Sequence, residues 1–159
     1  MSKNAFVAAV AVAVLLLDQA SKWYIQQTVS LYQQIPIFPT FFHITHARNT
    51  GGAFSLFAGA SDAFRIPFFF GATVIAIAAL VYFVWQVEPR QRLLQFALAG
   101  ILGGAVGNLI DRLTAGEVTD FLLFHWRGYH WPAFNVADSF ITIGVGLLLA
   151  HSLFERDQR

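Results

Sequence analysis

Long apolar segments alternate with more polar connections along this chain. Each of four segments holds about 20 residues with few charges, which is the length an α-helix needs to cross the hydrocarbon core of a bilayer. The segments lie at approximately residues 5–25, 66–85, 93–113 and 134–154. The pattern therefore predicts a mainly α membrane protein with four transmembrane helices.

A two-residue period follows the first apolar segment. The apolar members of this alternation are Ile35, Ile37, Phe42 and Ile44. Alternation of this kind is typical of β-strands and predicts a small sheet. A turn at residues 50–52 would lead into a return strand at residues 53–57. A short surface helix or a helix start follows, with Ser61 or Asp62 as its cap.

Composition supports a membrane protein and excludes several classes of function. Hydrophobic residues make up 57% of the 159 residues and charged residues only 12%, whereas soluble domains contain about 25% charged residues. A chain of this length has room for a single compact domain, residues 1–159. A net charge of +1 without a basic run argues against nucleic acid as a partner. The absence of cysteine excludes thiol nucleophiles, disulfides and thiolate metal sites.

Basic residues predict the orientation of the four segments, because cytoplasmic loops carry an excess of lysine and arginine. The short tails and the short loop between the second and third segments hold Lys3, Arg90, Arg92, Arg156 and Arg159. The two long connections hold Arg48, Arg65 and Arg127. We therefore expect both termini in the cytoplasm and both long connections on the outer side.

Two groups of polar residues lie within the predicted helices. Asp18 and Lys22 are four residues apart, in the order that favours an ion pair on a helix. We favour a structural role for this pair over catalysis, because a neutralised pair is poorly placed to move protons. Asp111 and Arg112 are best explained as a neutralised charge cluster at a packing seam, whereas Asn108 could serve either structure or function.

Asp120 and Asp138 lack a basic neighbour in the sequence. In a helix that begins near Phe134, Asp138 would lie about 6 Å below the outer end, and Asp120 on the preceding outward connection can reach the same level. Two close carboxylates share a proton, so that one acts as base and the other as acid, as in aspartic proteases. The structural alternative is that Asp138 only caps the helix.

Other chemistries fit the sequence less well. A Ser/Lys hydrolase would need Lys22, which already has Asp18 one turn away. The histidine pairs His43 with His46 and His125 with His130 contain possible metal ligands, but no HExxH pattern accompanies them. We therefore expect neither a metal ion nor a cofactor. A small proton-coupled carrier or channel is the alternative function, although such proteins place their acids near the membrane midplane.

Five motifs in this sequence resemble those of a known family, the lipoprotein signal peptidases or signal peptidase II, which are membrane aspartic proteases of bacterial lipoprotein maturation. The motifs are DQASK at 18–22, RNTGGAF at 48–54, GNLIDR at 107–112, VTDF at 118–121 and FNVADSFITIG at 134–144. They occur in the order of the family and cover most of the chain. Together they are far more specific than any one of them.

The resemblance assigns roles to ten positions. It implies that Asp120 and Asp138 are the catalytic dyad. The positions that line or support the substrate pocket are Asn49, Gly51, Asn108, Arg112 and Asn135. The positions tied to structure are Asp18, Lys22 and Asp111.

The resemblance also implies a fold, a location and a reaction. Four transmembrane helices would carry a small extracytoplasmic β-cradle and a short lid helix, both within about residues 33–65. The protein would lie in the bacterial cytoplasmic (inner) membrane as a monomer among membrane lipids, with its active site near the surface of the outer leaflet. It would remove the signal peptide from diacylglyceryl-modified prolipoproteins by cleaving before the lipidated cysteine.

Overall fold

Four long helices form the body of the protein. The structure, a computed structural model, describes residues 1–51, 56–57 and 59–156. Within these residues the helices are α1 (Lys3–Thr28), α2 (Asp62–Gln86), α3 (Arg92–Ala115) and α4 (Val136–Arg156). All four have the length and apolar composition needed to cross a membrane. The predicted segments agree with them, although α4 begins at Val136 rather than at residue 134.

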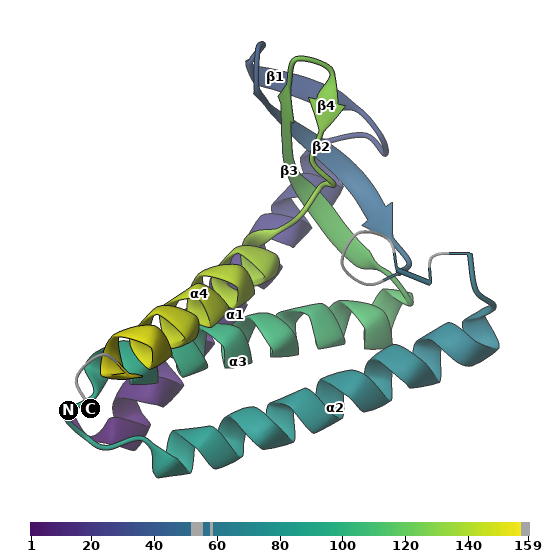
Figure 1. Ribbon diagram of the computed structural model, residues 1–159. Helices are drawn as coiled ribbons and strands as arrows, with labels where there is room; N and C mark the ends of the chain where they lie inside the picture. Colours follow the sequence, from purple (N-terminus) through teal and green to yellow (C-terminus); the bar gives the residue numbers. More distant parts are fainter. Residues whose placement is uncertain (52–55, 58, 157–159) are drawn as a thin grey trace.

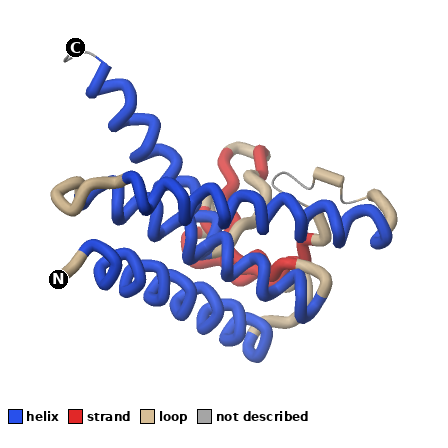
Figure 2. The backbone as a smooth tube through the Cα atoms, turned by 90° about the horizontal axis from the view of Figure 1, so that it is seen from below, coloured by secondary structure: helices blue, strands red, loops and turns tan. Residues whose placement is uncertain are grey.

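The ends of the chain and the sheet lie at opposite ends of the helices (Figures 1 and 2). Both termini and the short connection between α2 and α3 lie at one end. The strands gather beyond the end of α1 and the start of α4. This arrangement places both long connections on the same side of the helical body.

The central helix of the body is α3. It packs against α1, α2 and α4, and most of its apolar segment is buried, whereas the corresponding segment of α2 has no buried residue. Leucine and isoleucine side chains on the outer helices face outward, as Leu16, Ile75 and Leu149 do. In a bilayer these side chains contact lipid, so their exposure carries no hydrophobic penalty.

Glycines on α3 bring the neighbouring helices into close contact. A Cβ atom at Gly103 would lie 2.5 Å from the carbonyl oxygen of Ala11 on α1. A Cβ atom at Gly104 would lie 2.6 Å from the carbonyl oxygen of Ala137 on α4. Small residues at such crossings let helix backbones approach within van der Waals contact in membranes.

The sheet is antiparallel and takes strands from both long connections. In the described part of the chain its order is β1 (Gln34–Phe38), β2 (Phe42–Asn49), β3 (Val118–Trp126) and β4 (Tyr129–His130). Among the described strands, the neighbours of β2 are β1 and β3. The prediction of a return strand at residues 53–57 was wrong for Leu56 and Phe57, which form a turn. Residues 53–55 lie outside the described residues.

The predicted helix near residue 62 is the beginning of α2, whose N-cap is Ser61. The expected lid helix falls partly on residues 52–55 and 58, which lie outside the described residues. The fourth apolar segment starts later than predicted because the backbone of Phe134 pairs with Leu122 and extends the edge of the sheet.

An apolar cluster fixes the sheet to the end of α1. Ile25 and Val29 on α1 and the turn after it pack with Phe121 of β3. Ile35 and Ile44 of the first two strands lie against the same cluster. The cluster therefore determines how β3 lies relative to the helices, and β3 carries Asp120.

We predict that Gly104→Ala lowers the stability of the protein, because the added methyl group forces α3 and α4 apart. Overpacking of this kind costs roughly 1–3 kcal/mol. Thermal unfolding in detergent measures the effect. Gly146→Ala on α4 is the matched control, since a Cβ atom there meets nothing within 4 Å. Equal melting temperatures for the two variants would contradict the proposed close crossing.

Candidate functional site

A cavity of about 590 Å³ opens where the sheet meets the helices. Its walls come from the end of β2, the start of β3, the last turns of α3, the segment 131–134 and the start of α4. Asp120 and Asp138 both line it. Segments far apart in the sequence thus bring the two acids into one cavity.

Asp120 is held at the cavity by strand pairing. In the register of the sheet it lies opposite Ala47 of β2, beyond a register shift that follows Ile44. Its side chain is only 2% exposed. The amide of Asn49 donates a hydrogen bond to one carboxylate oxygen at 3.0 Å, and the amide of Asn135 donates to the other at 2.7 Å.

The environment of Asp120 favours its protonated form. Burial, and then the nearby charge of Asp138, raise the pKa of this carboxyl group to about 7, although the hydrogen bonds from Asn49 and Asn135 act to lower it. A carboxyl group with a pKa near neutrality can bind and release a proton at physiological pH.

Asp138 lies in the first turn of α4 and is half-buried. Its backbone N–H donates to the side-chain oxygen of Asn135 at 2.9 Å, and the Asn135 N–H lies 3.4 Å from a carboxylate oxygen of Asp138. This is a reciprocal cap at the start of a helix. The capping role considered for Asp138 is therefore real, but its other carboxylate oxygen accepts a hydrogen bond from Asn108 at 2.8 Å.

Asn135 connects the two acids. It is completely buried. Its side-chain NH₂ group donates to Asp120, while its backbone N–H and its side-chain oxygen engage Asp138. A shift of either acid would therefore disturb the hydrogen bonds of the other. Sequence spacing gave no indication of this bridge.

Arg112 and Gly51 lie together at the cavity wall. The Arg112 guanidinium donates to the carbonyl oxygen of Gly51 at 3.2 Å and lies over the ring of Phe69. The N–H of Gly51 donates to the side-chain oxygen of Asn49 at 3.0 Å. Arg112 thereby ties the end of β2 to α3 and presents a positive charge to the cavity.

The prediction of a neutralised charge cluster holds for Asp111, but its partner is not Arg112. Asp111 forms an ion pair with Lys22 at 2.8 Å, whereas Arg112 faces Gly51. Consecutive residues on a helix point about 100° apart, so these two side chains serve different sides of α3.

The predicted ion pair of Asp18 and Lys22 is confirmed, with 2.7 Å between its atoms. The structure adds two partners. The Lys22 ammonium also binds Asp111 and donates to the side-chain oxygen of Asn108 at 2.9 Å. Asp18 accepts a hydrogen bond from the backbone N–H of Ala137 at 2.9 Å, next to Asp138.

The structure pairs His43 with His125, whereas the sequence suggested His43 with His46 and His125 with His130. His43 and His125 lie on neighbouring strands with 3.1 Å between their Nε2 atoms. The ring of His130 stacks on that of His125, while His46 turns away to the carbonyl oxygen of Val29. Among the residues that the structure describes, no group of three potential ligands is arranged to hold a metal ion.

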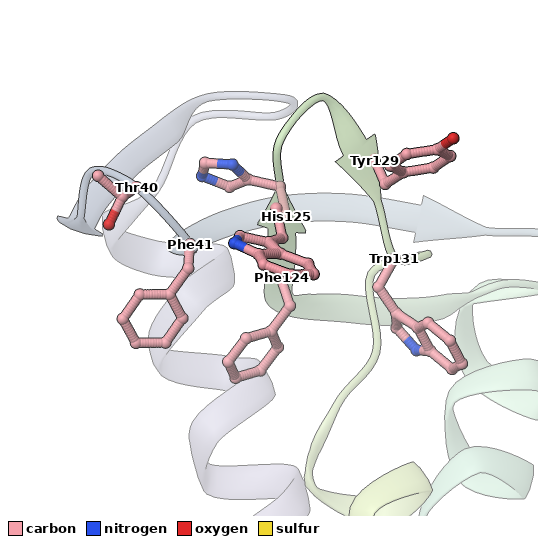
Figure 3. A pocket seen from close by; sticks show the side chains of 7 residues that line it. Thr40, Phe41, Phe124, His125, Tyr129 and Trp131 are labelled. Atoms are coloured by element: carbon pink, nitrogen blue, oxygen red, sulfur yellow. The ribbon is translucent and has the colours of Figure 1, made fainter.

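A second cavity of about 620 Å³ lies on the outer part of the sheet. Its lining is mostly aromatic. In Figure 3 the rings of Phe41 and Phe124 lie near each other at one end, and Trp131 lies at the other. Trp131 lines both cavities. Nothing in the hydrophobic pattern of residues 127–133 indicated this role, because the segment has no regular period.

Comparisons with known proteins assign the family. A family model described as signal peptidase (SPase) II matches residues 10–154. The chain is 47% identical to the lipoprotein signal peptidase of Geobacter metallireducens over 91% of this chain and 87% of the relative. It is 46% identical to the lipoprotein signal peptidase of Syntrophotalea carbinolica over 88% of this chain and 86% of the relative.

Solved structures agree with these relatives. One described as a bacterial membrane enzyme superimposes with a TM-score of 0.87 at 36% identity, covering 96% of this chain and 90% of the other. A second bacterial membrane enzyme gives a TM-score of 0.83 at 37% identity, with 92% of each chain covered. The chain therefore belongs to the signal peptidase II family, and it is a multi-pass membrane protease.

Proposed function

We propose that this protein is an aspartic endopeptidase that removes the signal peptide from diacylglyceryl-modified prolipoproteins by cleaving before the lipidated cysteine. The observation that carries the proposal is the placement of Asp120 and Asp138 in one cavity, joined by Asn135. Relatives that share most of the chain are lipoprotein signal peptidases, which supports the choice of substrate.

Hydrolysis uses the two acids in turn. The ionised carboxylate takes a proton from a water molecule, whose oxygen attacks the carbonyl carbon before the lipidated cysteine. The protonated carboxyl group donates its proton to the carbonyl oxygen. When the C–N bond breaks, the proton held by the first carboxylate passes to the leaving amine, and a hydroxyl proton of the tetrahedral intermediate returns to the second carboxylate as the C=O bond reforms. The pair ends with a single shared proton, as it began.

The neighbouring polar groups suit this reaction. Asn49, Asn108 and Asn135 donate hydrogen bonds to the two carboxylates and keep them in place before the substrate arrives. Fixed donors of this kind avoid reorganisation during the reaction. The Arg112 guanidinium, which lines the same cavity, can hold a backbone carbonyl of the substrate.

The position of the cavity suits a lipidated substrate. Acyl chains keep the modified cysteine at a fixed depth in the membrane, so a cavity at the end of a transmembrane helix meets the scissile bond without a search. We propose that the cavity lies near the surface of the outer leaflet of the bacterial cytoplasmic membrane, with both termini in the cytoplasm. In this proposal the chain acts as a monomer and a single domain.

The position of the acids argues against a proton-coupled carrier or channel. Asp120 lies on a strand outside the helices and Asp138 lies in the first turn of α4. A carrier would be expected to hold its acids near the middle of the membrane-spanning helices. We therefore retain hydrolysis as the function.

Asp120→Asn and Asp138→Asn should each lower kcat for a lipidated precursor peptide by roughly 10²–10⁴-fold, because each removes the acid or the base. Cleavage by purified protein in detergent measures the loss, and thermal unfolding checks that the variants are folded. Glu88→Gln is the control, since Glu88 is exposed and forms its ion pair with Arg90 outside the cavity. Normal cleavage by both folded asparagine variants would refute the dyad.

The pKa of Asp120 near 7 predicts a pH dependence. Because this pKa is raised, the carboxyl group is protonated below about pH 7, and the pair loses its shared proton as the pH rises through that value. We therefore expect kcat to fall on the alkaline side of neutrality, as measured from about pH 5 to 9. A kcat that stays constant or rises over the alkaline half, in protein that remains folded, would contradict this assignment.

Reporter fusions test the proposed orientation. Alkaline phosphatase, which is active only outside the cytoplasm, should be active when inserted in the hairpin between β3 and β4 and inactive when fused to the C-terminus. Green fluorescent protein at the C-terminus should fluoresce. The reverse pattern would place the sheet and its cavity on the cytoplasmic side.

A further inference from the structure

The Lys22 ammonium uses all of its hydrogen-bonding capacity in the protein. An ammonium group has three N–H donors and no acceptor. Its three partners are the carboxylates of Asp18 and Asp111, at 2.7 and 2.8 Å, and the side-chain oxygen of Asn108 at 2.9 Å. The Lys22 side chain is only 2% exposed, so water does not compete for these donors.

The two carboxylates fix the ammonium, and the ammonium in turn fixes the amide of Asn108. A side-chain amide can present either its oxygen or its NH₂ group to a neighbour. Because Lys22 can only donate, the atom of Asn108 that faces it must be the oxygen. The NH₂ group then points the other way and donates to Asp138 at 2.8 Å.

Asn135 supports this orientation but does not replace Lys22. Its NH₂ group also lies 3.2 Å from the Asn108 oxygen. That group has two hydrogens and three acceptors, which also include the carbonyl oxygen of Thr119 and the carboxylate of Asp120. The contact with Asp120, at 2.7 Å, is the shortest of the three. The contact of Lys22 with Asn108 is shorter than that of Asn135 with Asn108 and involves a full charge.

Without the ammonium, the amide of Asn108 would be free to turn. Its oxygen could then face the carboxylate of Asp138, where two acceptors repel each other. Asp138 would lose a hydrogen bond that favours its ionised form and fixes its direction. The reacting group would change, although Lys22 itself lines no part of the cavity that holds the two acids.

We propose that Lys22 is a positioning residue of the active site, which acts by holding the Asn108 amide so that its NH₂ group faces Asp138. This inference rests on the proposed function and extends it. The role goes beyond the stabilising one that the resemblance assigns to this position. Asp18 and Asp111 contribute by keeping the ammonium in place.

Replacing Lys22 alone would leave two buried carboxylates without their cation, which is strongly destabilising. The experiment therefore uses Lys22→Met in an Asp111→Asn background, with Asp111→Asn alone as the reference. The added change should lower kcat for a lipidated peptide by roughly 10- to 100-fold, the effect of losing one hydrogen bond to a charged group. KM should stay within about twofold, since Lys22 does not contact the cavity.

The other lysine of the chain, Lys3, supplies a matched control. Lys3 donates to the carbonyl oxygens of Val84, Trp85 and Val87 at the opposite end of the helices. Lys3→Met should lower the melting temperature without changing kcat of the folded protein. A purely structural Lys22 would behave in the same way, and that result would overturn the proposal.

A double-mutant cycle with Asn108→Ala tests the route of the effect. If Lys22 acts through Asn108, Lys22→Met should change kcat by less than about twofold once the amide is gone. If Lys22→Met lowered kcat equally with and without Asn108→Ala, action through Asn108 would be refuted. Should Lys22→Met not fold, Lys22→Gln replaces it in the same measurements, because its amide is polar but reaches about one bond less far.

Failure of the proposed function would be distinguishable from failure of this inference. Cleavage by the parent protein and its loss in Asp120→Asn are measured beside the Lys22 variants. An inactive parent, or an active Asp120→Asn protein, would overturn the proposed function. An active parent whose folded Lys22 variants keep the reference kcat would overturn this inference alone.

Discussion

Polar side chains at the sheet end of the helices have to form hydrogen bonds and ion pairs with one another, because a membrane interior offers no water as a partner. Lys22 has three protein acceptors, Asn135 binds both acids, and Asp18 accepts the N–H of Ala137. Apart from the local contacts of Lys22 with Asp18 and of Asn135 with Asp138, these contacts join elements that are distant in the sequence. The rest of the site depends on this mutual hydrogen bonding. If one of these aspartates moved, a buried N–H donor would lose its acceptor.

The same contacts hold the helices together and form the site. Lys22 on α1 reaches α3, Asp18 on α1 reaches α4, and Asn135 before α4 reaches β3. Gly103 and Gly104 let α1 and α4 approach α3 closely enough for short polar side chains to meet. Stability and positioning therefore share residues here, and substitutions at this end of the protein are expected to affect both.

Local sequence patterns predicted the helices and one ion pair, but they did not predict the contacts between distant elements. Four apolar segments predict the helices, because a segment of about 20 apolar residues has the length that an α-helix needs to cross the bilayer. The ion pair of Asp18 and Lys22 follows from their spacing on one helix. The pairing of β2 with β3 joins strands from two connections, so no local period indicates it. The ion pair of Lys22 with Asp111 depends likewise on how α1 packs against α3.

The sequence by itself determined the membrane class, the helices, the absence of thiol chemistry and the two acids without a basic neighbour. These properties depend on composition and on spacing within one element. Only the tertiary structure decided that Asp120 and Asp138 line one cavity, that Asn135 joins them and that Arg112 faces Gly51 rather than Asp111. The physical reason is that hydrogen bonds depend on distances of about 3 Å, and such distances between different elements are set by packing.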